Sequence, residues 1–276
     1  MKTKPVALIT GATSGIGEAT AHRLHDRGYT VFAAGRNPAA LDALRCKGLA
    51  ARELDVTDQV AAARLVEEIN AEHVGVDVLV NSAGYPLPRP LEQVELSELR
   101  QLFETNVVAT LHLSQAVLPT MRARGHGRIV TIGSTGGRFT SPGAGAYHVV
   151  KYGVEALSLS LGAEVAPCGV RVVLIDPTGV RTRFVSSQFE TEHSYPDDDP
   201  YRDFKIRYSE TTRRLATAKG LTVSADTVAR VVVRAVQAKN PRPRYVVGAS
   251  GKASVLARAL LSDRMWDRVM TTGLKG

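Results

Sequence analysis

The chain has 276 residues, of which 44% are hydrophobic and 22% are charged. This length suffices for one large core, so we expect a single domain spanning residues 1–276. The N-terminal lysines precede an apolar run, residues 6–10, that is too short for a signal sequence or a membrane span. Cys46 and Cys168 lack metal-like or CxxC spacing. We therefore expect a cytoplasmic protein in which both thiols are reduced and buried as small hydrophobic side chains.

The net charge of +8 arises in the last third of the chain. Residues 1–180 carry 17 Lys and Arg and 17 Asp and Glu, so we expect no nucleic-acid partner. Residues 241–276 hold seven basic and two acidic side chains, in the pattern of a short strand and a basic amphipathic helix. We expect residues 249–276 to form a basic helical tail. Such a tail suits contact with a membrane, but a solvated or subunit-packing tail is the preferred interpretation.

Short runs of β-forming residues alternate with helical patterns along the chain. The runs are mostly continuous in apolar residues, which is typical of strands buried on both faces. They cover residues 6–10, 30–34, 48–56, 76–81, 127–132 and 170–177. Apolar spacings of three and four predict helices between them, including residues 97–121 and 145–166, and residues 225–248 suggest a helix and a last strand. The alternation predicts an α/β fold with one doubly wound, Rossmann-type parallel sheet and helices on both faces.

Residues 10–17, TGATSGIG, form a glycine-rich turn between the first predicted strand and the first predicted helix. Its glycines allow the backbone to turn tightly and approach a pyrophosphate, while the helix N-terminus offers free N–H groups and a favourable dipole. We expect this turn to bind a nucleotide cofactor. The expected contacts are Gly11, Thr13, Ser14, Gly15, Ile16 and Gly17.

Tyr147 and Lys151 stand four residues apart in an otherwise apolar helical segment. Positions i and i+4 of a helix share one face, so the hydroxyl and the ammonium are able to meet in one pocket. A surface Tyr and Lys at this spacing are also common by chance. The pair alone therefore leaves both interpretations open.

The spacing TGxxxGxG, joined to YxxxK at residues 147–151, resembles the classical short-chain dehydrogenase/reductase family, and more specifically its hydroxysteroid- and retinol-dehydrogenase-like branch. Four further positions match the family in order and in context. They are Asp55 after the third strand, the NSAG segment 81–84, Asn106 in the following helix, and Ser134 at the end of the fifth strand. Two positions depart from it, since Thr178 replaces a turn glycine and Val150 stands where many members carry Ser.

The resemblance implies a catalytic set made of Asn106, Ser134, Tyr147 and Lys151. Ser134 would hydrogen-bond the substrate oxygen, Tyr147 would exchange its proton, and Lys151 would grip the nicotinamide ribose. Asn106 would order a water of the proton relay, with capping or kinking of its helix as the alternative. Further cofactor contacts are implied for Asp55, Val56, Asn81, Ala83, Gly84, Tyr147, Lys151, Pro177, Gly179, Val180 and Thr182.

The Tyr–Lys pair also has an electrostatic rationale. Free tyrosine has a pKa of about 10, which must fall by roughly three units for efficient proton exchange near neutrality. The Lys151 ammonium and an oxidised nicotinamide ring would stabilise the phenolate. His148 adjoins Tyr147, but neighbouring helix positions diverge, so we expect it to serve packing or to lie at the surface. The histidines show no metal-ligand spacing, and we predict no metal.

Cofactor choice depends on residues 31–37, VFAAGRN, at the end of the second predicted strand. NAD-binding sheets place an Asp or Glu there on the ribose 2′-hydroxyl, whereas NADP-binding sheets lack the acid and place a cation nearby. Here Gly35 occupies the place of the acid and Arg36 follows it. We therefore expect NADP(H), with Arg36 gripping the 2′-phosphate. A solvated Arg36 at the start of a loop is the alternative.

Residues 178–222 form a long connection that we expect to act as a substrate lid. It holds six of the 15 aromatic residues, which indicates either an apolar substrate or simple anchoring of the lid. They are Phe184, Phe189, Tyr195, Tyr201, Phe204 and Tyr208.

We expect an enzyme, an NADP(H)-dependent oxidoreductase that transfers hydride between nicotinamide and a carbonyl or secondary alcohol of a lipophilic small molecule. A reductase of ketoacyl thioesters on a carrier protein is the runner-up. A nucleotide-binding regulator that has lost catalysis is the alternative outside enzymes. Broad apolar faces on the helices 97–121 and 145–166 suggest a homodimer or homotetramer.

Overall fold

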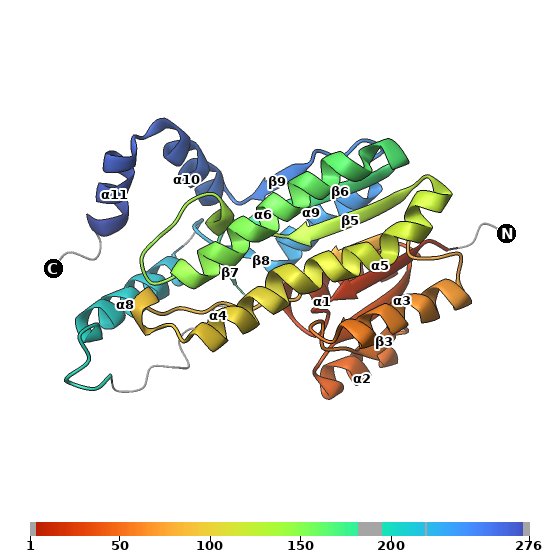
Figure 1. Cartoon of the computed structure of the whole chain (residues 1–276), viewed down its shortest axis with the longest axis horizontal. Helices are drawn as coiled ribbons and strands as arrows, with labels where there is room; N and C mark the ends of the chain where they lie inside the picture. Colours follow the sequence, from red (N-terminus) through yellow and green to blue (C-terminus); the bar gives the residue numbers. More distant parts are fainter. Residues whose placement is uncertain (1–3, 182–194, 219, 273–276) are drawn as a thin grey trace.

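The computed structural model describes residues 4–181, 195–218 and 220–272, and its centre is a seven-stranded sheet in the order β3-β2-β1-β4-β5-β6-β9 (Figure 1). All six pairings in this sheet are parallel. The strands are β1 Val6–Thr10, β2 Thr30–Gly35, β3 Ala50–Glu53, β4 Val78–Asn81, β5 Gly127–Ile132, β6 Val170–Pro177 and β9 Arg244–Val247. The predicted doubly wound parallel sheet is confirmed.

Helices cover both faces of the sheet. On one face lie α3 Gln59–Glu72, α5 Ala109–Arg124 and α6 Gly145–Val165. On the other lie α1 Gly15–His25, α2 Pro38–Cys46 and α9 Ala225–Gln237. Each crossover thus carries its helix back across the sheet to the start of a parallel neighbour.

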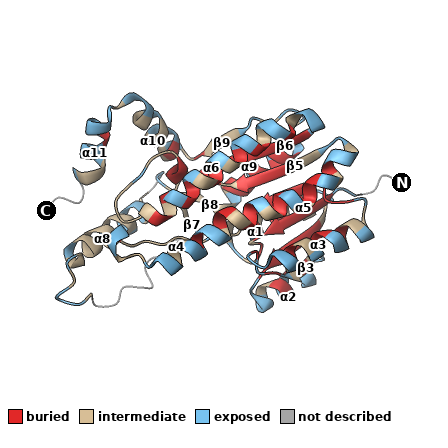
Figure 2. Cartoon of the chain, viewed as in Figure 1, coloured by how far each residue is buried: buried red, intermediate tan, exposed pale blue. Residues whose placement is uncertain are grey.

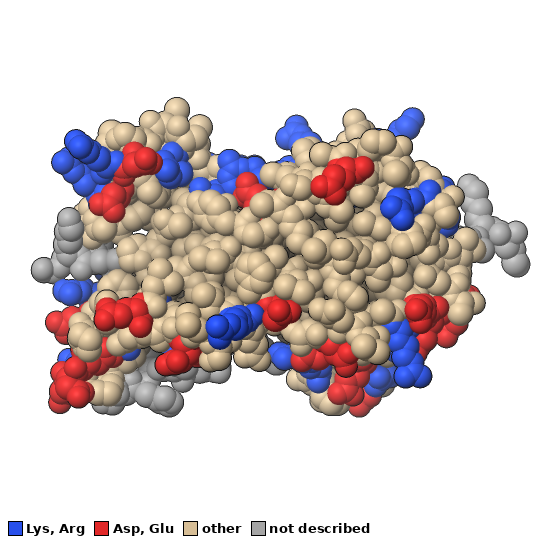
Figure 3. All heavy atoms as spheres, viewed as in Figure 1, with Lys and Arg blue, Asp and Glu red and all other residues tan. Residues whose placement is uncertain are grey.

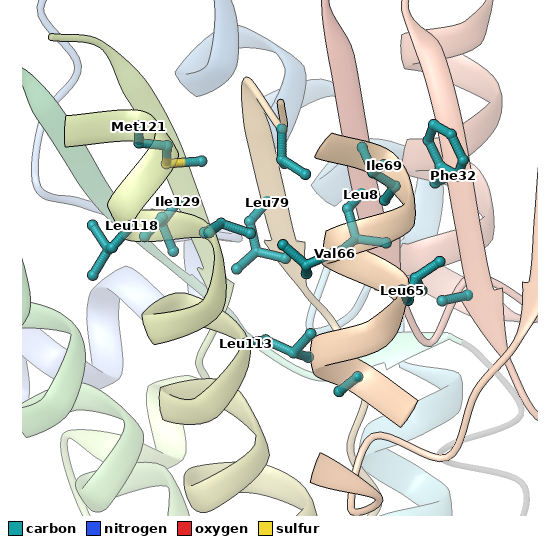
Figure 4. Close-up of a cluster of buried hydrophobic side chains, with 14 of the residues drawn as sticks. Leu8, Phe32, Leu65, Val66, Ile69, Leu79, Leu113, Leu118, Met121 and Ile129 are labelled. Carbon is teal, nitrogen blue, oxygen red and sulfur yellow. The ribbon is translucent and has the colours of Figure 1, made fainter. Parts of the chain in front are cut away.

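Alternate residues of each strand contribute to the two halves of the core. In β1, Leu8 packs toward α3 and α5, while Ile9 packs toward the opposite helices. Figure 4 shows Leu8 together with Leu79 and Ile129 of the neighbouring strands, facing side chains from α3 and α5. This burial on both faces is why the strand sequences show no polar alternation.

The predicted helix 97–121 is interrupted in the structure. It consists of α4 Leu96–Phe103, a π-helical turn Glu104–Val108, and α5. Asn106 lies in this turn, where the side-chain amide nitrogen donates to the carbonyl of Leu102 at 3.0 Å. A π-helical turn widens the backbone spiral locally and often marks a functional site.

The chain after β6 returns to the sheet through a second small element. β7 Val180–Arg181 pairs in parallel with β8 Val223–Ser224, so the two ends of the segment 178–222 lie side by side. Within that segment the structure describes α8 Arg202–Thr217. The predicted tail helix is two helices, α10 Ala249–Leu260 and α11 Asp263–Thr272, because the backbone becomes extended at Leu261.

Burial follows these layers, with buried residues in the sheet and on the inner sides of the helices (Figure 2).

The expectation of buried thiols is wrong, since Cys46 and Cys168 are both exposed. Cys46 is the last residue of α2, whose buried side is formed by Leu41 and Leu44. Within the described residues, every helix is too short or too polar to cross a membrane.

Candidate active site

A cavity of about 800 Å³ opens where the strands of the sheet end. Its lining combines the turns after six strands with residues from α6 and the C-terminal third of the chain. Because parallel strands bring all their carboxyl ends to one edge, segments far apart in sequence converge there. From the predicted cofactor set the lining holds Gly11, Thr13, Ser14, Gly15, Ile16, Arg36, Asp55, Val56, Ala83, Gly84, Tyr147, Lys151, Pro177, Gly179 and Val180.

The glycine turn is closely packed against the end of β4. The hydroxyl of Thr10 accepts from the backbone N–H of Ser82 at 3.1 Å and of Ala83 at 3.3 Å. Gly11 has a φ of +62°, and a Cβ there would lie 2.9 Å from the backbone of Ala83. Gly17 is buried below the turn, where a Cβ would overlap the carbonyl oxygen of Gly11, so its function is packing rather than lining the cavity.

The N-terminus of α1 faces the cavity. Ser14 is the N-cap residue, and its side chain makes no capping hydrogen bond. Ser14, Gly15 and Ile16 all line the cavity at this point. The first backbone N–H groups of a helix have no partner within the helix and favour an anion, so this turn fits a phosphate-bearing cofactor.

Arg36 and Asp55 form the outer rim of the cavity. The guanidinium of Arg36 lies 3.4 Å from the carboxylate of Asp55, and its side chain is 72% exposed. Hydrogen bonds from the backbone and hydroxyl of Thr57 hold the pKa of Asp55 below its usual value, with a smaller contribution from Arg36. Asp55 is therefore ionised at neutral pH, and Arg36 is free to turn from this exposed pair toward an added anion.

The segment 81–84 divides between core and cavity. Asn81 is buried, outside the cavity lining, and its amide nitrogen lies 3.4 Å from the hydroxyl of Ser114. Its predicted cofactor contact therefore finds no support in this geometry. Asn106 is also buried, outside the lining, and its side-chain amide oxygen is directed at Gly84 with no partner among the described residues. Any role in a relay would act through a group placed between this oxygen and the cavity.

The central group of the site joins the end of β5 to the start of α6. Ser134 and Tyr147 are linked by a side-chain hydrogen bond. The ammonium of Lys151 donates to the carbonyl of Ile132 at 3.1 Å and lies 5.6 Å from the centre of the Tyr147 ring. The spacing of four residues therefore does bring Tyr147 and Lys151 together in one cavity.

The expectation of a depressed tyrosine pKa is not met by the protein's own groups. Burial, together with the smaller effect of the nearby Asp176, raises the pKa of Tyr147 to about 12, against the hydrogen bond from Ser134. Burial lowers the pKa of Lys151 to about 8, against the favourable charge of Asp176. Desolvation of both groups outweighs the benefit of their proximity, so depression of the tyrosine pKa requires an additional positive charge in the cavity.

His148 holds the loop that carries Ser134. Its Nδ1 lies 2.7 Å from the carbonyl oxygen of Gly136, and its Nε2 accepts from the backbone N–H of Ser141 at 3.0 Å. The N–H of Ser141 requires an acceptor at Nε2, so the proton lies on Nδ1 and is donated to Gly136. Burial lowers the pKa of His148 and keeps the ring neutral. The expected packing role is thus a specific one, fixing the loop 134–141 against α6.

A buried charge cluster lies beneath the Tyr–Lys pair, and none of its residues was predicted from the sequence. Asp176, near the end of β6, is 3.3 Å from the guanidinium of Arg244 in β9. Arg244 and Arg138 both pair with Glu155 of α6. Burial and the neighbouring Glu155 raise the pKa of Asp176 to about 7, against the effect of Arg138 and Lys151. Strand β6 has the sequence pattern of a buried apolar strand, and the carboxyl of Asp176 within it could have indicated a functional group.

The C-terminal third of the chain closes the cavity in a way that the sequence did not indicate. Ser254 of α10 and Met270 of α11 line it, and Trp266 of α11 packs edge-on against Phe139 with ring centres 5.3 Å apart. The expected solvated or subunit-packing tail therefore contributes to the site. Other lining residues that were not predicted include Tyr85, Thr105, Ser141, Thr212, Leu215, Leu221 and Ser250.

The turn after β6 completes the cavity. Pro177, Thr178, Gly179 and Val180 line it, so the departure at Thr178 does not remove this turn from the site. Thr178 packs against Gly248, and its hydroxyl lies 3.1 Å from that of Ser250. The predicted contacts of Thr182, Phe184 and Phe189 lie outside the described residues. Among the described residues no group of three or more His, Cys, Asp or Glu is placed to hold a metal ion.

The sheet, the glycine turn and the Tyr–Lys pair define a dinucleotide-binding oxidoreductase. Residues 5–193 match the family model for short chain dehydrogenases, and the chain belongs to this family.

Two curated relatives and one solved structure illustrate the relationship. The NADPH-dependent 3-dehydrocapnine reductase of Ornithobacterium rhinotracheale is 31% identical over 98% of this chain and 97% of its own. The 3-ketodihydrosphingosine reductase of Bacteroides thetaiotaomicron is 33% identical over 73% of each chain. A short-chain dehydrogenase from Streptomyces avermitilis superposes with a TM-score of 0.81 at 30% identity, covering 98% of this chain and 96% of the other.

The charge of Asp176 should set the alkaline limit of the oxidoreductase activity. Its carboxylate favours the Lys151 ammonium and raises the pKa of Tyr147, so Asp176→Asn lowers the pKa of both proton-bearing groups. We expect the alkaline limb of the kcat/KM profile to move down by about one pH unit. The alkaline limb of Asp77→Asn should stay in place, because Asp77 pairs with Arg124 at the amino ends of the strands, opposite the cavity. An unmoved limb in Asp176→Asn would exclude this electrostatic role.

Proposed function

We propose that the protein is an NADP(H)-dependent oxidoreductase that transfers hydride between the nicotinamide and a carbonyl or secondary alcohol of a lipophilic small molecule. The observation that carries this proposal is the hydrogen-bonded pair Ser134–Tyr147, with the Lys151 ammonium beside it, in the same cavity as the glycine turn. Gly11, Gly15 and the open N-terminus of α1 make a cradle that fits a pyrophosphate, and Gly17 allows the turn to pack beneath it. When bound, the cofactor supplies or accepts the hydride and, when oxidised, adds a positive charge.

The protein's own residues then manage the proton and the substrate oxygen. Ser134 donates a hydrogen bond to the substrate oxygen and fixes its position beside Tyr147. Tyr147 protonates that oxygen in reduction and takes the proton back in oxidation. Lys151, held by the carbonyl of Ile132, is placed to hold ribose hydroxyls, and its charge would add to that of the oxidised nicotinamide in favouring the phenolate. Asn106 would act from behind Gly84 through an ordered water.

Preference for the phosphorylated cofactor rests on the end of β2. Gly35 leaves no carboxylate to repel a 2′-phosphate, and the exposed Arg36 is placed at the cavity rim. A Cβ at Gly35 would lie 2.6 Å from the Thr13 methyl group, so the glycine also allows the first turn to pack here. The related reductase from Ornithobacterium rhinotracheale is NADPH-dependent by name, in agreement with this proposal.

We propose that residues 178–222 act as the substrate lid of a single domain formed by residues 1–276. In the described part, Thr212, Leu215 and Ala216 of α8 line the main cavity. The aromatic residues divide between the two expected roles. The hydroxyl of Tyr201 anchors the lid on Glu92, while Phe204 and Tyr208 face a further cavity.

A homodimer is the assembly that the outer face of α6 supports. Val149, Tyr152, Ala156 and Leu159 form an exposed apolar stripe at spacings of three and four, with Val149 51% and Tyr152 44% exposed. Figure 3 shows few charged side chains over the middle of this face. An exposed apolar stripe of this kind suits the same stripe of a second copy, related by a two-fold axis.

Replacing the proposed proton donor should separate chemistry from binding. Tyr147→Phe removes only the hydroxyl, so we expect turnover of a reactive ketone to fall by at least about 100-fold. The affinity for NADPH, measured by titration, should remain nearly unchanged. Tyr152→Phe, on the outer face of α6, provides the control and should keep full activity. Near-normal turnover of Tyr147→Phe would remove Tyr147 from the mechanism, and absence of turnover by the parent protein with every ketone tested would favour a regulator.

Cofactor discrimination should reside in Arg36. A charge-assisted contact to the 2′-phosphate corresponds to about 10- to 150-fold in affinity, so Arg36→Ala should weaken NADPH by this factor and leave NADH little changed. Arg45→Ala is the matched control, because this exposed arginine of α2 pairs with Asp42 away from the cavity. Equal affinity of the parent protein for NADH and NADPH, at one ionic strength, would contradict the assignment.

A charge placed in the apolar stripe should dissociate the dimer. Tyr152→Glu would bury an unpaired carboxylate between two copies, and we expect the dimer Kd to rise at least about 100-fold. Val60→Glu is the control, since Val60 is 79% exposed on α3 and lies outside the stripe. Sedimentation velocity measures both variants. A parent protein that sediments as a monomer at micromolar concentration would refute the dimer.

A further inference from the structure

A second cavity of about 420 Å³ lies beside the main one and is called the side chamber here. Its walls are the proline-rich loop 85–90, Gly143, Tyr195 and the inner side of α8. Tyr85 and Thr212 line both cavities, so the chamber adjoins the space in front of Tyr147 and Ser134. Its volume lies within the range of small-molecule sites.

The hydroxyl groups at the boundary are already paired. Tyr208 forms a side-chain hydrogen bond with Thr212, and Tyr85 forms one with Thr105. Burial raises the pKa of Tyr208, so the phenol is neutral. Because these groups are satisfied within the protein, the rings offer their apolar faces to an occupant.

Both cations of the chamber also have partners. Arg89 pairs with Glu98, and Lys205 lies 2.6 Å from the carboxylate of Asp199. An anionic occupant would have to compete with these carboxylates for each cation. The chamber therefore favours a neutral, apolar group over a phosphate or carboxylate.

The walls are held in place without an occupant. Asp199 accepts from the side chain of Gln93 at 2.8 Å and from the backbone N–H of Tyr201 at 2.9 Å, which ties the start of α8 to the segment after the proline-rich loop. Phe204 stacks on Tyr208 with ring centres 6.1 Å apart. Gly143, with a φ of +80°, leaves room for the Tyr208 ring, which would be 2.6 Å from a Cβ there. A cavity built in this way loses little entropy on binding.

We infer that the side chamber holds a hydrocarbon arm of the substrate, which is therefore a ketone or secondary alcohol with an apolar arm such as an unbranched alkyl chain. With the reacting carbon in front of Tyr147, one substituent enters the chamber past Tyr85 and Thr212. The other faces Phe139 and Met270 in the main cavity. This inference rests on the proposed function and adds to it the substrate class.

The test is a series of methyl ketones from 2-butanone to 2-dodecanone, reduced with NADPH. Each methylene that enters the chamber should raise kcat/KM about fourfold, until the chamber is full and the values level off. Ser209 of α8 lines the chamber, so Ser209→Trp places an indole there and should abolish the gain per methylene. Glu210→Trp is the matched control, because Glu210 is the next residue of α8, exposed and outside the chamber lining.

A variant with the opposite effect guards against misfolding of Ser209→Trp. Phe204→Ala enlarges the chamber, so the levelling point should move to longer ketones. Reduction of 2-butanone with no gain for longer ketones would overturn the chamber assignment and leave the proposed function intact. The same holds if Ser209→Trp and Glu210→Trp respond alike to chain length. Absence of reduction across the whole series would overturn the proposed function, and the chamber assignment with it.

Discussion

Parallel pairing of the strands is the constraint on which the rest of the molecule depends. It brings the ends of β1, β4, β5 and β6 to one edge, where the backbone has polar groups left over after the last ladder hydrogen bond. The structure uses these groups directly. The Thr10 hydroxyl joins two strand ends, and the carbonyl of Ile132, the last residue of β5, accepts from Lys151. A buried ammonium is tolerable there because this acceptor and the charge of Asp176 compensate part of its lost hydration.

The features that could be predicted from the sequence are those with local causes. The strands at 6–10, 127–132 and 170–177 coincide with the observed ones, because continuous apolar β-formers have few alternatives in a chain of this pattern. The glycine turn and the YxxxK spacing are likewise local geometry, and both contribute to the cavity. The helix expected at 97–121 was only partly right, because a π-helical turn leaves the apolar period almost unchanged while it widens the backbone.

The features that could not be predicted depend on contacts between distant segments. Asp176 forms an ion pair with Arg244, and Met270 lines the same cavity as Gly11. The tyrosine pKa belongs to the same class, because proximity to Lys151 is local but desolvation depends on everything packed around the pair. Exposure of Cys46 follows from which side of α2 meets the sheet, and that side is set by Leu41 and Leu44. Residue type and spacing therefore indicate which groups take part in the chemistry. The pKa values of those groups depend on their burial, which the whole fold determines.

In the function proposed above, the main cavity carries the polar chemistry and the side chamber holds the apolar part of the substrate, and the pairing of hydroxyl groups in each cavity supports this division. In the main cavity, the hydroxyl of Ser134 is hydrogen-bonded to that of Tyr147. Both hydroxyl groups can turn to hydrogen-bond a substrate oxygen instead, so neither is left buried without a partner. In the side chamber, Thr212 is hydrogen-bonded to Tyr208. An alkyl group has no polar atom that could replace either partner, so this hydrogen bond stays intact when such a group binds. The surroundings of each hydroxyl pair therefore decide whether its hydrogen bond opens toward a substrate or stays closed. The Lys151 ammonium and the glycine turn adjoin the first pair, whereas ring faces and paired cations adjoin the second. Under the proposed function, a ketone would bind with its oxygen toward Tyr147 and its hydrocarbon toward α8.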